Sequence, residues 1–295
     1  MPSDGLDPAS LLVIAIIAVT LALMYFKRFG ATQLLIIGNL AVFFVIILSP
    51  YGVVWNDLGL RPIYLQNGRN LYTLFTSMFL HADAAHIFFN VLYLFLIGVQ
   101  LEERIGKGKY IVIFLLAGLV GGLLESVVRW DTTGIIIGAS GAISGTMGAL
   151  LLLYPRDRIP MIVVIIFLPS VPVWAAVGSW FGLQAVLALS DPLGPTAYAA
   201  HIGGFFVGML LAHFVPSFKR TERPIALDVG QLEALATTPE LKDALEKIRT
   251  ESQPDIKKAW LEYFAAHARC PRCEKPLELH GNKLKCACGY ESDLK

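Results

Sequence analysis

The sequence predicts an all-α polytopic membrane protein that ends in a small soluble tail, and three observations support this fold class. The chain of 295 residues is 55% hydrophobic and only 16% charged, which is too apolar for an ordinary soluble domain. Its apolar residues gather in seven long stretches separated by polar loops. Its charged residues and all of its cysteines concentrate instead near the carboxyl end.

The seven apolar stretches predict transmembrane helices, because a helix needs about 20 residues to cross the hydrocarbon core. They cover residues 11–26, 34–48, 86–101, 110–128, 140–154, 173–189 and 197–214. Residues 159–167 are also apolar, but prolines at positions 155, 160, 169 and 172 surround and interrupt them. Because proline breaks helices, we expect this segment to be a loop or an interfacial segment.

The first apolar stretch has the length of a secretory signal peptide. However, Asp4 and Asp7 stand where a signal peptide carries positive residues, and no clear small-residue cleavage site follows. We therefore expect a retained transmembrane helix within residues 1–31.

Lysine and arginine residues in the loops predict the orientation, because they are enriched in cytoplasmic loops. Ten lie on one side: Lys27, Arg28, Arg104, Lys107, Lys109, Arg156, Arg158, Lys219, Arg220 and Arg223. Only Arg61, Arg69 and Arg129 lie on the other. This asymmetry predicts an external N-terminus, an external loop at residues 50–73 and a cytoplasmic tail.

The tail is distinguished by its charge. Residues 1–216 carry 10 Lys and Arg and 10 Asp and Glu, whereas the rest of the chain carries 14 and 13. Residues 217–269 predict a helical linker with two amphipathic helices. The apolar face of the first contains Leu241, Ala244, Leu245 and Ile248, and that of the second contains Ile256, Ala259, Trp260, Tyr263 and Phe264. The net charge of +1 gives no indication of a nucleic-acid partner, whereas the tail suits a cytoplasmic protein partner.

Residues 270–295 contain two cysteine pairs, Cys270-Pro-Arg-Cys273 and Cys286-Ala-Cys288, which resemble the knuckles of a zinc ribbon. Two disulfides are the alternative, but a cytoplasmic location is reducing and favours metal. His280 is a substitute for one ligand, although four thiolates already complete a closed site. We expect structural Zn²⁺ here and no cofactor for catalysis.

Three places in the apolar part carry polar side chains that point to chemistry, because such groups are costly in a bilayer. His86 and Asn90 are four residues apart, so they share a helix face, while Ser140 and His201 each stand near the start of an apolar stretch. Each has a structural alternative: close helix packing at Ser140, a backbone partner for His201, and interhelical hydrogen bonds for His86 and Asn90. Gly204 and Gly208 we interpret as packing residues.

Together these residues predict a Ser–His dyad. The predicted topology places all of them near the external ends of their helices, where a serine nucleophile requires a histidine base. His86, Asn90 and the Ser140 N–H are donors suited to an oxyanion. No carboxylate is placed to orient His201, which excludes a triad. Glu102 and Arg104, after the third stretch, we expect to form a solvated loop pair.

The arrangement of motifs over residues 32–216 resembles the rhomboid intramembrane serine proteases. The shared motifs are His81 with His86-x-x-x-Asn90, Glu102-x-Arg104, Gly138-Ala139-Ser140-Gly141, and Ala200-His201-x-x-Gly204-x-x-x-Gly208. The resemblance implies a six-helix bundle with a re-entrant element at residues 50–73, to which this chain adds one N-terminal span. Tyr72-Thr73 stands where the family commonly has an aromatic–arginine pair.

By the resemblance, Ser140 is the nucleophile, His201 is the base, His86 and Asn90 form the oxyanion hole, and His81, Gly138 and Gly141 support the site. The function implied is cleavage of the transmembrane helices of substrate proteins near their ends, within the lipid bilayer. Two alternatives are a non-proteolytic rhomboid-like protein that binds membrane clients and a transporter. A transporter would carry acidic residues deep in several spans, and only Glu125 approaches this.

Overall fold

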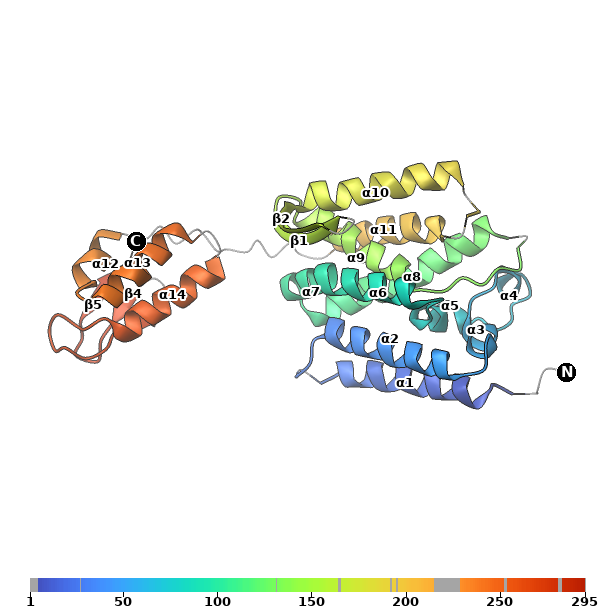
Figure 1. Ribbon diagram of the computed structural model, residues 1–295, viewed down its shortest axis with the longest axis horizontal. Coiled ribbons are helices and arrows are strands. Elements are labelled where there is room, and N and C mark those ends of the chain that lie inside the picture. The colour runs from blue at the N-terminus through green and yellow to red at the C-terminus, as the bar shows by residue number, and fades with distance from the viewer. Residues whose placement is uncertain are drawn as a thin grey trace. The chain divides into compact units, whose positions relative to one another are not determined.

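The computed structural model describes residues 5–26, 28–130, 132–163, 166–191, 193–194, 196–214, 229–251, 254–280 and 283–294. The chain divides into two compact units, Met1–Phe218 and Lys219–Lys295. Each unit has its own apolar core. In the described residues, the first unit is mostly helical with one pair of strands, and the second combines helices with a small sheet (Figure 1). The chain is therefore mostly helical and not all-α.

All seven predicted apolar stretches are helical. Four helices of the described chain are long and apolar enough to span a bilayer: α2 (Ala31–Leu48), the continuous segment Ala84–Ile105, α8 (Lys107–Val128) and α10 (Val173–Ser190). Three shorter apolar helices are α1 (Pro8–Met24), α9 (Ser140–Leu153) and α11 (Tyr198–His213). This set identifies an integral, multi-pass membrane protein.

The segment Ala84–Ile105 consists of α6 (Ala84–Tyr93), one wider π-type turn at Leu94–Gly98 and α7 (Val99–Ile105). Between α2 and α6 lie the short helices α3 (Val53–Leu58), α4 (Pro62–Gln66) and α5 (Thr73–Thr76), which is followed by a 3₁₀ turn at Ser77–Phe79. In Figure 1, α3, α4 and α5 lie at the same end of the first unit as the start of α1. The predicted loop at residues 50–73 is thus largely helical.

The additional helix α1 is attached to this end by a carboxylate. Asp57 of α3 accepts hydrogen bonds from the Asp7 backbone N–H at 3.1 Å and from the Ser10 hydroxyl at 2.7 Å. Asp7 in turn caps α1 through the Ala9 N–H at 2.8 Å. At the other end, the Glu102 carboxylate accepts from the first two N–H groups of α2 at 2.6 and 2.8 Å.

The expectation of a solvated pair between Glu102 and Arg104 was wrong. Glu102 caps α2, whereas Arg104 forms an ion pair with Asp157 at 3.0 Å and donates to the Gln100 carbonyl at 2.6 Å. Each side chain connects its helix to a different element. The unsatisfied N–H groups at a helix N-terminus explain why Glu102 finds a partner there.

The strand β1 (Arg158–Val163) pairs antiparallel with β2 (Ile166–Pro172). The prolines exclude a helix, as expected, but they still permit a strand ladder. The register shifts between Ile159 and Met161, so Pro160 lies at the irregularity, where its missing N–H is tolerated.

The second unit contains α12 (Val229–Leu235), α13 (Pro239–Thr250), α14 (Pro254–His267) and an antiparallel sheet of β3 (Glu278–His280), β4 (Lys283–Lys285) and β5 (Glu291–Asp293). The predicted face of α13 is buried, and Thr238 caps the helix through the Leu241 N–H. The predicted face of α14 was partly right: Phe264 is buried and Trp260 packs against the core. Leu261 and Ala265 are buried as well, whereas the predicted Ile256 and Tyr263 are exposed. Packing against α13 and β3, rather than intrinsic periodicity, sets this face.

The helices α8, α9 and α11 form the closely packed centre of the first unit. A Cβ atom at Gly208 would lie 1.9 Å from the Gly145 carbonyl oxygen, and one at Gly204 would lie 2.1 Å from the Gly141 oxygen. Real Cβ contacts are never this short, so glycine is required for α11 to approach α9. The interpretation of Gly204 and Gly208 as packing residues is confirmed.

We predict that Gly208→Ala destabilises the bundle, because the added methyl group meets backbone that no rotamer change can move. Overpacking of this kind costs at least about 1–3 kcal/mol. Thermal unfolding of the purified protein in detergent measures the loss. Gly178→Ala is the matched control, since a Cβ atom at Gly178 of α10 meets nothing within 4 Å. Equal unfolding temperatures for the two variants would contradict the packing argument.

Candidate active site

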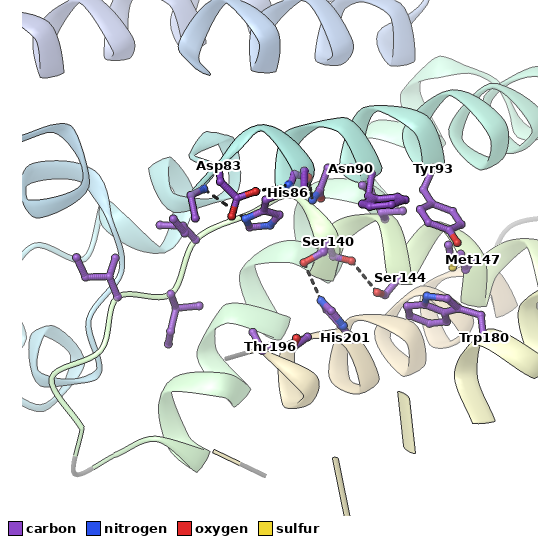
Figure 2. A pocket seen from close by; sticks show the side chains of 18 of the residues that line it. Asp83, His86, Asn90, Tyr93, Ser140, Ser144, Met147, Trp180, Thr196 and His201 are labelled. Atoms are coloured by element: carbon purple, nitrogen blue, oxygen red, sulfur yellow. Dashed lines mark hydrogen bonds between the residues drawn. The ribbon is translucent and has the colours of Figure 1, made fainter. Parts of the chain in front are cut away.

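Ser140 and His201 meet at the ends of two packed helices. Ser140 is the first residue of α9 and His201 is the fourth residue of α11. Ser140 Oγ lies 2.8 Å from His201 Nε2, and Figure 2 shows the two side chains pointing toward each other. His201 is 8% exposed, so the pair is largely shielded by the bundle.

The pair lines a cavity of about 610 Å³. His86 and Asn90 line the same cavity from α6, as the shared helix face predicts (Figure 2). The Asn90 side-chain amide donates to the His86 carbonyl at 2.8 Å, and the His86 N–H donates to the Asp83 carboxylate at 2.8 Å. The Asp83 and Asn90 side chains thus bind the backbone N–H and the carbonyl of His86. These two bonds fix the start of α6 and hold His86 and Asn90 at the cavity wall.

Gly138 makes room for the His86 ring. Its φ of +122° favours glycine, and a Cβ atom there would lie 2.7 Å from His86 Nε2. The Gly138 N–H donates to the Ser77 carbonyl at 2.9 Å, which fixes the approach to α9. His86 Nε2 thus lies close to the loop that leads into Ser140.

His81 and Gly141, the other two predicted supporting residues, lie beside His86 and Ala200. His81 is fully buried, and its ring centroid lies 4.9 Å from that of His86 in an edge-on arrangement. A Cβ atom at Gly141 would lie 3.3 Å from the Ala200 carbonyl oxygen, so Gly141 belongs to the close contact between α9 and α11.

The structure adds Gln184 of α10, which sequence reasoning missed. Gln184 Oε1 lies 2.8 Å from His201 Nδ1, opposite the serine. Trp180, one helical turn earlier, has its ring centroid 6.1 Å from that of His201. The sequence feature that indicates Gln184 is an amide side chain in the middle of the apolar stretch 173–189.

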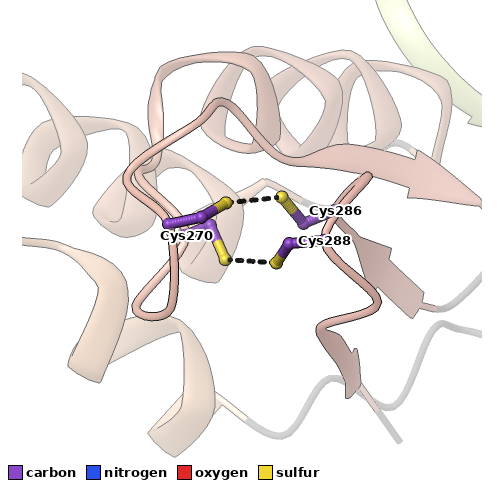
Figure 3. Close-up of side chains that lie close together, drawn as sticks. Cys270, Cys286 and Cys288 are labelled. Carbon is purple, nitrogen blue, oxygen red and sulfur yellow. Dashed lines mark hydrogen bonds between the residues drawn. The ribbon is translucent and has the colours of Figure 1, made fainter.

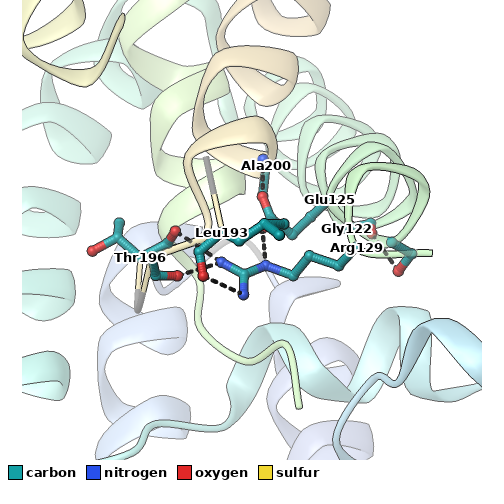
Figure 4. A network of polar contacts seen from close by, with 8 residues as sticks. Gly122, Glu125, Arg129, Leu193, Thr196 and Ala200 are labelled. Atoms are coloured by element: carbon teal, nitrogen blue, oxygen red, sulfur yellow. Dashed lines mark hydrogen bonds and ion pairs between the residues drawn. The ribbon is translucent and has the colours of Figure 1, made fainter. Parts of the chain in front are cut away.

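Glu125 of α8 is a second group whose role the sequence did not reveal. Its side chain is fully buried, and it forms an ion pair with Arg129 one turn later. Its other carboxylate oxygen accepts from the Ala200 N–H at 3.0 Å, directly before His201 (Figure 4). Arg129 also donates to the carbonyls of Gly194 at 2.5 Å and Thr196 at 3.2 Å. The pair thereby fastens the start of α11 and the preceding loop to α8.

The second unit brings the four cysteines together. Their Sγ atoms all lie within 4.8 Å of one another, and Figure 3 shows Cys270 and Cys288 on opposite loops. The pairs Cys270–Cys288 and Cys273–Cys286 have Sγ separations of 3.6 and 3.4 Å, and all four thiols are free. Tetrahedral zinc–thiolate bonds of about 2.3 Å require sulfur separations of roughly 3.8 Å, so the cluster fits a metal.

The environment of Cys270 favours a ligand. Desolvation raises the pKa of this thiol, but hydrogen bonds from the backbone N–H groups of Arg272 and Cys273 and with the thiols of Cys288 and Cys286 together lower the pKa to about 7. A thiolate is the form that binds metal. His280, the substitute ligand considered above, instead pairs with Glu278 at 3.1 Å.

The sequence is similar to known proteins. The model of the Rhomboid domain matches residues 68–218. RHOMBOID-like protein 7 of Arabidopsis thaliana is 30% identical over 174 residues, which are 56% of this chain and 50% of that protein. RHOMBOID-like protein 1 of the same plant is 29% identical over 173 residues, 56% of this chain and 40% of that protein.

A bacterial relative is similar at the same level. Rhomboid protease GlpG of Salmonella newport is 31% identical over 159 residues, which are 52% of this chain and 51% of that protein. The chain thus spans about half the length of the curated relatives it matches.

We predict that Arg129→Met strongly destabilises the protein, because it leaves the Glu125 carboxylate buried without a counter-charge. Breaking a buried ion pair in this way costs about 3–5 kcal/mol. Adding Glu125→Gln should restore much of the loss, since an amide needs no counter-charge and its oxygen still accepts from Ala200. Thermal unfolding in detergent compares the variants.

Arg104→Met serves as the control for this prediction. Its partner Asp157 is 38% exposed, so the abandoned carboxylate is hydrated and the loss should stay near or below about 1 kcal/mol. If Arg129→Met were no more harmful than Arg104→Met, the buried pair would not hold the loop.

Proposed function

Because the chain belongs to the rhomboid family, we propose that it is an intramembrane serine endopeptidase with Ser140 as nucleophile and His201 as base. One observation carries the proposal: the 2.8 Å contact between Ser140 Oγ and His201 Nε2 inside a cavity of a membrane-embedded bundle. The close packing of α9 and α11 does not by itself require a hydrogen-bonded serine and histidine at its edge. The same contact favours proteolysis over the binding of membrane clients.

In the proposed reaction, Ser140 Oγ attacks a peptide carbonyl carbon while His201 Nε2 accepts its proton. His201 then gives this proton to the leaving amine, and a water molecule hydrolyses the acyl-enzyme by the reverse steps. The Ser140 backbone N–H at the start of α9, together with His86 and Asn90, would stabilise the oxyanion. Rotation of the Asn90 amide away from the His86 carbonyl would free its donor.

The substrates we propose are transmembrane helices of other proteins. The cavity is lined by Phe89, Tyr93, Met147 and Trp180 beside the dyad, which suits an apolar segment that enters from lipid. A substrate segment must be unwound at the reacting peptide bond, because a helix hides its carbonyls in hydrogen bonds.

We also propose that the site faces the outside and that the second unit is cytoplasmic. Support comes from the ten-to-three distribution of positive loop residues. In the structure, Lys107 donates to the Phe26 carbonyl at 2.7 Å at the α1–α2 turn, while Asp57 of α3, which accepts from the Asp7 N–H before α1, belongs to the opposite end. The dyad shares that opposite end with Gly138 and Asp83, so water would enter from there.

For the second unit we propose a structural Zn²⁺ held by Cys270, Cys273, Cys286 and Cys288. A site of four thiolates has no open coordination position, so the metal would stabilise the fold and take no part in hydrolysis. We also propose that this unit binds a cytoplasmic protein.

Ser140→Ala and His201→Ala should each reduce cleavage of a model transmembrane substrate by at least about 10³-fold, and the double variant should be no worse than either single one. Cleavage by the purified protein in liposomes measures the effect. Ser126→Ala is the control, because its hydroxyl donates to the Gly122 carbonyl within α8. Full cleavage by Ser140→Ala would rule out the proposed nucleophile.

Purified full-length protein should contain one zinc per chain, and Cys270→Ser or a chelator should lower the unfolding temperature of the second unit, because folding and metal binding are linked. Metal analysis and calorimetry measure the two effects. His280→Ala should retain the metal, since its ring pairs with Glu278. Protein that folds normally with four reactive thiols and no metal would contradict the assignment.

A further inference from the structure

Gln184 is a polar side chain in the middle of α10, a largely apolar helix. An amide at this depth is costly in a bilayer unless it has a partner. Its partner is His201, whose Nδ1 lies 2.8 Å from Gln184 Oε1. Since Nε2 of the same ring lies 2.8 Å from Ser140 Oγ, the imidazole is held between the glutamine and the serine.

The chemistry of the dyad determines which ring nitrogen must carry the proton. His201 accepts the Ser140 proton only if Nε2 presents a lone pair, so the proton of the neutral imidazole must reside on Nδ1. An oxygen acceptor opposite Nδ1 stabilises this tautomer. Trp180 lies one helical turn before Gln184, so α10 presents an aromatic ring and an amide oxygen to the same imidazole.

We propose that Gln184 is a positioning residue of the active site, which orients His201 and holds its proton on Nδ1. The inference rests on the proposed proteolytic function. It assigns to a neutral amide the orienting role that an aspartate has in a serine protease triad. The amide adds no charge to the membrane interior. Its hydrogen bond from Nδ1 becomes stronger when His201 takes up the serine proton and becomes cationic.

Kinetics of cleavage test the role directly. Gln184→Leu removes the acceptor and should lower kcat about 10- to 100-fold, the value of a hydrogen bond to a group that becomes charged, with little change in KM. Gln184→Glu keeps an oxygen at the same distance and should retain more of kcat than the leucine variant. Leu183→Ala is the matched control, because Leu183 is 56% exposed on the same helix and does not line the cavity.

Wild-type kcat in Gln184→Leu, or equal losses in the leucine and glutamate variants, would overturn the inference. A rise in KM with unchanged kcat would also overturn it, because it would indicate that Gln184 contacts the substrate and does not orient His201. Cleavage by the wild type and its absence in Ser140→Ala are measured first, so failure of the protease proposal is recognised separately.

The tautomer of His201 is measured on the wild-type protein, so this test does not depend on whether the Gln184 variants fold. Nitrogen-15 NMR of histidine-labelled wild-type protein in detergent, with His201 assigned by its loss in His201→Ala, distinguishes the tautomers. A proton on Nδ1 supports the inference. A proton on Nε2 would mean that the Gln184 amide nitrogen faces the ring and would overturn it.

Discussion

The backbone contact between α9 and α11 is the constraint on which the site depends. Gly204 and Gly208 of α11 lie against the backbone of Gly141 and Gly145 of α9, at distances that leave no space for a Cβ atom on either α11 glycine. In a bilayer, such close approach replaces the hydrophobic effect as the source of helix association. The hydrogen bond of the dyad sits at the end of this contact. A small increase in helix separation would therefore act directly on the 2.8 Å distance.

A second feature of the bundle is that its buried and half-buried polar groups join elements distant in sequence. Glu102 of α7 caps α2, Glu125 of α8 binds the start of α11, and Gln184 of α10 binds the ring of His201. Each partner satisfies a group that would otherwise be costly in an apolar environment. Each of these bonds joins two helices. The bonds therefore also determine which helix ends lie together at the site.

The sequence predicted the features that depend on composition and local spacing. The seven apolar stretches are helices, and the face shared by His86 and Asn90 lines the cavity with Ser140 and His201. Features that depend on long-range packing escaped prediction. The partners of Glu102 and Gln184 belong to other helices, the buried face of α14 is set by its neighbours, and a strand ladder formed where prolines only excluded a helix.

The contrast between Glu125 and Gln184 explains how two polar side chains are accommodated near one histidine. Glu125 is a buried carboxylate and therefore requires a cation, which Arg129 supplies one turn away. That cation also binds the loop carbonyls before α11, so the charge pair fixes backbone. Gln184 contacts the ring itself and needs no counter-ion, because its amide is neutral. A carboxylate in its place would attract the imidazolium formed during the proposed reaction, but beside the neutral imidazole of the resting protein it would be a charge in an apolar bundle without a counter-ion. The division between a charged pair that holds the backbone and a neutral amide that holds the ring is thus the arrangement that electrostatics in an apolar bundle favours.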